Sequence, residues 1–96
     1  MRLIYSELAV RDLLRLRAFI AEKNPPAARR VSAELVTRIG RLRDFPGLGR
    51  EVSRAPDPSA MRDAVFGNYV VRYVPRPDAL IILRIWHHFE DRDGRD

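Results

Sequence analysis

Hydrophobic residues recur every three or four positions through the first half of the chain, which is the pattern of amphipathic helices. Ser6 followed by Glu7 is a favourable helix start, and Asn24-Pro25 both ends this helix and suits the first turn of another. So short a connection predicts an antiparallel helical hairpin. The predicted core-facing positions are Ala9, Leu13, Leu16, Ile20, Ala28, Val31, Leu35, Ile39 and Leu42, with Leu14, Phe19, Val36 and Phe45 beside them.

Runs of β-branched and aromatic residues follow the helical pattern and predict strands at 61–66, 69–74 and 80–88. Gly67-Asn68 is a favourable two-residue turn between the first two of them. The last run is almost continuously apolar, which indicates a strand at the centre of a sheet. A shorter apolar run at 2–5 predicts one further strand ahead of the helices.

These elements occur in the order βααβββ, which indicates an α+β fold with an N-terminal strand, an antiparallel helical hairpin and a three-stranded antiparallel meander. A chain of 96 residues has room for one domain, so a single domain over residues 1–96 is expected. Residues 48–60 show no periodicity and predict an irregular loop. The charged tail at 89–96 is expected to fray.

Composition indicates the cellular compartment of the protein and the charge of its partners. The chain has no cysteine, which excludes disulfides and thiolate metal sites and is typical of a reducing compartment. It also lacks an apolar run long enough for a signal peptide or a membrane span, so a cytoplasmic protein is expected. No cofactor is expected. Basic residues outnumber acidic ones by 18 to 13, and all but Lys23 are arginine. Such a surface predicts an acidic partner, either a protein or a nucleic acid.

Arg84 interrupts the most apolar strand. Simple alternation places it on one face with Leu80, Ile82 and Trp86, where a charge has to be paired or lie at an open edge. One interpretation is a structural ion pair with an aspartate or glutamate of a helix. The other is a cationic site that a partner covers, which Arg62 on a neighbouring strand could join.

His87 and His88 are the only histidines, and they end the last strand with side chains on opposite faces. Either could act as a general acid or base, or simply pack at the strand end. A metal site is not expected, because no third ligand is suitably spaced.

Two other segments have a structural and a functional interpretation. Tyr69, Val71 and Tyr73 share one face of a strand and either pack in the core or stack on bases. The segment 46–50 either terminates the second helix, with a left-handed glycine, or has a functional role.

The order and spacing of these pieces resemble the RelE/ParE superfamily, the toxins of bacterial type II toxin–antitoxin modules, and within it the ParE-like, plasmid-stabilisation branch. The resemblance extends over nearly the whole chain. The residues that carry it are Ala9, Asp12-Leu13, Asn24-Pro25, Ala27-Ala28, Ile39-x-x-Leu42-x-x-Phe45-Pro46, Gly49-Arg50, Arg62, Tyr69-x-Val71-x-Tyr73 and Ile82-Leu83-Arg84-Ile85-x-His87.

The resemblance implies a toxin that inhibits DNA gyrase by protein binding, so that cleaved DNA persists. Arg62, Arg84 and His87 are the candidate target contacts, chosen for their place on the sheet. RelE-like toxins instead cut mRNA on the ribosome, using lysines and arginines of the central strands and a tyrosine near the C-terminus. Here the only lysine is Lys23, far from those strands, and Val70 stands where RelE-like chains have an arginine.

Two alternatives to gyrase inhibition stay open. The chain could be a RelE- or YoeB-like mRNA endonuclease that uses Arg62, Arg84, His87 and His88. It could also be a degenerate, non-toxic homologue that still binds an antitoxin.

The resemblance also implies a cognate antitoxin similar to ParD. Its acidic and apolar C-terminal segment would lie along the helical hairpin and the sheet edge, with Arg11, Arg15 and Arg41 at the rim of the contact. The toxin would then reach DNA only through the antitoxin.

Overall fold

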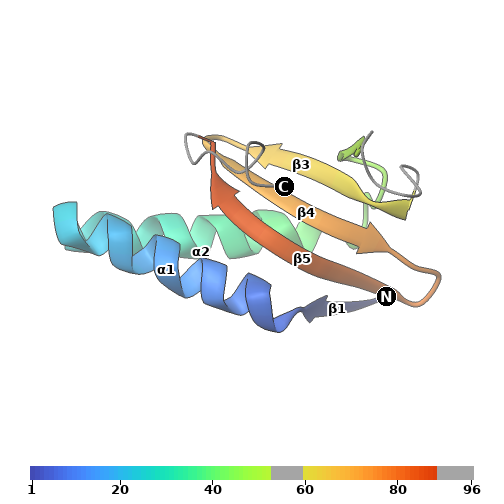
Figure 1. Cartoon of the computed structure of the whole chain (residues 1–96), viewed down its shortest axis with the longest axis horizontal. Coiled ribbons are helices and arrows are strands. Elements are labelled where there is room, and N and C mark those ends of the chain that lie inside the picture. The colour runs from blue at the N-terminus through green and yellow to red at the C-terminus, as the bar shows by residue number, and fades with distance from the viewer. Residues whose placement is uncertain (53–59, 89–96) are drawn as a thin grey trace.

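Two helices lie side by side against one face of a five-stranded sheet (Figure 1). The structure is a computed structural model, and it describes residues 1–52 and 60–88. The elements are β1 (Arg2–Tyr5), α1 (Glu7–Lys23), α2 (Pro25–Arg41), β2 (Arg50–Glu51), β3 (Arg62–Phe66), β4 (Tyr69–Pro75) and β5 (Ala79–His87). The predicted α+β fold and its order of strands and helices are therefore confirmed, with one short strand added.

The strands lie in the order β1-β5-β4-β3-β2. The last three long strands form the predicted antiparallel meander, while β1 pairs with β5 in parallel. Strand β5 is inside the sheet only along part of its length, because β1 pairs with residues 79–82 and ends there. The second half of β5 therefore needs a different neighbour.

The short strand β2 lies within the segment that was predicted to be an irregular loop. Arg50 and Glu51 pair antiparallel with Asp63 and Arg62 of β3, at the edge of the sheet. Two residues are too few to show an alternating pattern, so the sequence contains no signal for them. The rest of the predicted loop, 53–59, and the predicted frayed tail, 89–96, lie outside the described residues.

A bulge in β5 overturns one prediction about Arg84. Arg72 of β4 pairs with Arg84, but the next residue, Tyr73, pairs with Ile82, so Leu83 is an extra residue. This shifts the alternation of the strand by one position. Ile82 and Ile85 are both in the core, whereas Arg84 lies on the opposite face with Trp86. The prediction that Arg84 shares a face with Leu80 and Ile82 was wrong.

Both helices begin, and α1 ends, as the sequence indicates, whereas α2 ends at Arg41, ahead of the segment 46–50 that was predicted to terminate it. Ser6 accepts a hydrogen bond from the N–H of Ala9, and Asn24 caps α2 by accepting from the N–H of Ala27.

Neither helix within the described residues is long and apolar enough to cross a membrane. The buried stripe is narrower than expected, because the four flanking positions are exposed: Leu14 by 59%, Phe19 by 53%, Val36 by 42% and Phe45 by 64%.

The buried hydroxyl of Tyr73 fastens the segment after α2 to the sheet. It donates to the carbonyl of Pro46 at 2.7 Å and accepts from the N–H of Gly49 at 2.8 Å. A Cβ at Gly49 would lie 2.8 Å from the backbone carbonyl of Asp63, so this position has no room for a side chain. Neither Gly47 nor Gly49 adopts the left-handed conformation that was expected of a helix-terminating glycine there. Close approach to β3, rather than backbone conformation, requires glycine at 49.

Replacing Gly49 by alanine is expected to lower the free energy of unfolding by about 1–3 kcal/mol, because β3 and the Tyr73 ring would have to move. Gly47 is the matched control, because it also has no positive φ and a Cβ there meets nothing within 4 Å. Urea unfolding of both variants measures the difference, and equal losses for Gly49→Ala and Gly47→Ala would contradict this account.

Candidate functional site

Helix α1 covers the part of the β5 edge that β1 leaves open. The backbone N–H of Ser6 donates to the carbonyl of Ile82 at 2.9 Å, and the Ser6 hydroxyl donates to the carbonyl of Leu83 at 2.8 Å. Further along, the N–H of Ile85 donates to the carboxylate of Asp12 at 2.9 Å. The helix thus satisfies backbone groups that would otherwise be unpaired, and one of its carboxylates replaces a strand carbonyl.

The Asp12 carboxylate is the centre of a buried ion pair. Asp12 is only 4% exposed, and Arg84 donates to both of its oxygens, from Nε at 2.8 Å and from Nη2 at 3.1 Å. Arg15 lies one turn along α1 and adds a longer contact of 3.4 Å. The interpretation of Arg84 as the partner of a helix carboxylate is confirmed.

The pKa of the Asp12 carboxyl reflects two opposing effects. Burial alone would raise this pKa, because it disfavours the charged form. The hydrogen bond from Arg84, the hydrogen bond from the Ile85 N–H, the positive charge of Arg84 and the contact with Arg15 all favour the carboxylate. Together they outweigh burial, and the pKa of Asp12 lies below its ordinary value.

A second ion pair lies on the sheet face that points away from the helices. Arg72 donates to both carboxylate oxygens of Asp63, at 2.9 and 3.1 Å, and its guanidinium lies 5.1 Å from the centre of the Trp86 ring. Sequence reasoning missed this pair, although a signal exists. A two-residue turn at Gly67-Asn68 fixes the register of the hairpin and places Asp63 directly opposite Arg72.

The residues that an RNA-cleaving enzyme would need do not converge. Arg62 pairs across strands with the core residue Tyr73 and donates to the carbonyl of Gly49 at 2.7 Å. His87 pairs with Tyr69 instead, and their rings meet edge to face with centres 5.2 Å apart. Tyr69 and Tyr73 are four residues apart on β4, which is roughly 13 Å along a strand.

The other two candidates lie elsewhere again. Arg84 is on the opposite face of the sheet and is bound to Asp12, and His88 is exposed just beyond the end of β5. No group of three metal-ligating side chains occurs in the described ranges 1–52 and 60–88. These four predicted residues are therefore spread over both faces of the sheet and the end of β5.

The predicted antitoxin contacts lie on the two helices. Arg11 is exposed and pairs with Glu7 on its own helix at 2.7 Å. Arg15 reaches Asp12 and also donates to the carbonyl of Ile85, at the limiting distance of 3.5 Å. Arg41 ends α2 and, because the helices are antiparallel, lies at the same end of the hairpin as Arg11.

Comparisons with known proteins agree with this fold. Residues 3–92 match the family described as "ParE toxin of type II toxin-antitoxin system, parDE". "Toxin RelE3" of Caulobacter vibrioides is 34% identical over 84 residues, which cover 88% of this chain and 90% of that protein. "Toxin RelE1" of the same species is 33% identical over 92 residues, covering 93% and 95%.

A solved structure shares the architecture at lower sequence identity. It is described as "Chromosomal ParDE TA system from P. aeruginosa" and has a TM-score of 0.77 at 19% identity. The match covers 91% of this chain and 95% of that chain. The resemblance stated from sequence to the RelE/ParE superfamily is confirmed.

The lowered pKa of Asp12 predicts how its contribution to stability depends on pH. The ionised carboxylate stabilises the fold fully above its unfolded-state pKa, about 3.8, and this contribution is lost as pH falls through the lower folded-state pKa. The free energy of unfolding of the wild type should therefore fall more steeply below pH 4 than that of Asp12→Asn, which has no carboxyl to titrate. Urea unfolding between pH 2.5 and 7 measures both slopes, and parallel curves would show that this carboxylate does not carry the dependence.

Proposed function

Because the chain belongs to the ParE toxin family of type II toxin–antitoxin systems, we propose that it acts by binding DNA gyrase rather than by cutting RNA. The observation that supports this choice is the separation of the four candidate catalytic residues. Arg62 and His87 lie roughly 13 Å apart along the sheet, and Arg84 is on the other face. Catalysis of phosphoryl transfer needs such groups around one phosphate.

Names of relatives do not decide between the two activities. Two relatives are called RelE toxins, whereas the family model is named for ParE. The choice therefore depends on this chain's own side chains. Arg62, Arg84 and His87 stay our candidates for contacts with gyrase, since all three are partly accessible; the Arg84 side chain, for example, is 27% exposed despite its pairing with Asp12.

A cognate antitoxin is the proposed regulator, and α1 has the surface that would bind it. Val10 and Leu14 are exposed by 44% and 59% and lie one helical turn apart, so they form an apolar strip with Arg11 beside it. An acidic and apolar antitoxin segment would bury this strip and meet Arg15 at the middle of α1 and Arg11 and Arg41 nearer one end of the hairpin. We place this interaction in the cytoplasm, with DNA contacted through the antitoxin.

Purified toxin is expected to make gyrase accumulate cleaved plasmid DNA while leaving mRNA on ribosomes intact. The binding account also predicts that the His87→Gln/His88→Gln double variant weakens this effect only through a lower affinity for gyrase, so that more toxin restores it, because His87 is a candidate contact and no proton transfer is involved. Gel assays of plasmid cleavage and of ribosome-bound mRNA measure both activities. Codon-specific mRNA cleavage that the double variant loses would instead establish an endonuclease, and inactivity in both assays would favour a degenerate toxin.

Leu14→Asp is expected to weaken antitoxin binding by at least tenfold, because it puts an unpaired charge into the apolar contact. Leu48→Asp is the matched control, since Leu48 is equally exposed, at 59%, but lies in the segment after α2. Isothermal titration of each variant with the cognate antitoxin gives the two affinities. Similar losses at both positions would place the antitoxin elsewhere.

A further inference from the structure

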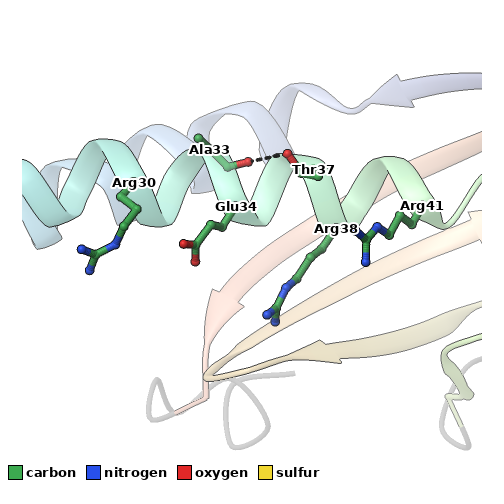
Figure 2. A pocket seen from close by; sticks show the side chains of 6 residues that line it. All are labelled: Arg30, Ala33, Glu34, Thr37, Arg38 and Arg41. Carbon is green, nitrogen blue, oxygen red and sulfur yellow. Dashed lines mark hydrogen bonds between the residues drawn. The ribbon is translucent and has the colours of Figure 1, made fainter.

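The outer side of α2 has a shallow hollow of about 420 Å³ that no sequence motif indicated. Figure 2 shows its lining, which comes from this one helix: Arg30, Ala33, Glu34, Thr37, Arg38 and Arg41. Arg30, Glu34 and Arg38 follow one another at four-residue intervals, so their charges alternate along one face in steps of about 6 Å. The result is a regular pattern of positive, negative and positive charge.

These charges are not neutralised within the described part of the chain. Arg30, Glu34 and Arg38 make no ion pair there, although each neighbour in the series is only one turn away. By contrast, Arg11 on α1 is paired with Glu7 at 2.7 Å. Thr37 in the lining needs no further partner, because its hydroxyl already donates to the carbonyl of Ala33 at 3.0 Å.

Arg41 lines the hollow and also lies at the rim of the proposed antitoxin contact, but the rest of this face differs in composition from the surface that we assign to the antitoxin. Its lining has no large apolar side chain, whereas α1 presents Val10 and Leu14. Interfaces that stay together are the more apolar ones, and transient contacts are more polar. A polar face that also includes small residues suits a partner that binds and leaves.

We propose that this face of α2 binds a helix of the toxin's protein target, with carboxylates opposite Arg30 and Arg38 and a basic residue opposite Glu34. This proposal rests on the proposed function, in which the target is DNA gyrase. The sign of Glu34 argues for a protein helix rather than a nucleic acid, because a carboxylate in the middle of the face would repel a continuous row of phosphates. The small side chains of Ala33 and Thr37 leave room for a second helix to approach closely.

The test compares gyrase binding by the wild type, Arg38→Glu, Glu34→Lys and the control Arg29→Glu. Arg29 is also exposed, but it lies about 100° around α2 from Arg30 and is not among the residues that line the hollow. Arg38→Glu and Glu34→Lys should each weaken binding about tenfold, because each reverses one charge of the pattern, while Arg29→Glu should change it less than about twofold. Affinity for the antitoxin should be unchanged in all three variants, which also shows that they are folded.

Each other outcome overturns the inference in a recognisable way. Tighter DNA or gyrase–DNA binding by Glu34→Lys would mean that the face meets a polyanion. Unchanged gyrase binding by both hollow variants would place the target elsewhere, while leaving the proposed function intact. A wild-type toxin that does not bind gyrase would overturn the proposed function together with this inference.

Discussion

The fold depends on how the open edge of β5 is satisfied. Strand β1 is only four residues long, so it pairs with β5 as far as Ile82 and leaves the backbone beyond exposed to α1. An unpaired buried N–H costs about 1–3 kcal/mol, and the Asp12 carboxylate removes that cost by accepting from Ile85. The carboxylate is itself buried, so it needs the guanidinium of Arg84. Asp12 of α1 thus binds both the backbone at the open edge of β5 and the guanidinium of Arg84, which lies on the face of the sheet away from the helices.

This arrangement has a direct consequence for function. An arginine in the middle of a central strand is a natural candidate for binding a phosphate, but the guanidinium of Arg84 already donates to both oxygens of Asp12. Arg62 similarly donates to the carbonyl of Gly49 and helps hold the segment after α2. The two arginines that could have formed a catalytic pair lie on opposite faces and have structural partners. We therefore assign them at most a binding role through their accessible atoms, and we look for further function on the outer surfaces, where α1 exposes Val10 and Leu14 and α2 carries alternating charge.

Local patterns in the sequence were sufficient for most of the fold. The caps at Ser6 and Asn24, the hairpin at Gly67-Asn68 and the strands on either side of it depend on neighbouring residues, so they could be predicted directly. The bulge at Leu83 could not, because it arises from pairing between β4 and β5 and from the α1 contact. Alternation alone therefore placed Arg84 on the wrong face.

The partner of Arg84 was predicted by class but not by residue. A buried charge requires an opposite charge, which correctly pointed to an acidic residue of a helix. Asp12 is separated from Arg84 by 72 positions, and only the tertiary arrangement of α1 against β5 brings them together. The hollow on α2 was missed for another reason: alternating charge on a helix is common on solvated surfaces and indicates nothing by itself.

The central claim is that the Arg84 guanidinium is committed to Asp12 and is therefore not available for chemistry. A double-mutant cycle with Asp12→Asn, Arg84→Met and the combined variant, measured by urea unfolding at pH 7, tests this directly. We predict a coupling free energy of about 2 kcal/mol or more, because either single change leaves one buried partner unpaired. A coupling close to zero would contradict the account, since the Arg84 guanidinium would then not depend on Asp12 and would be available to act on a substrate.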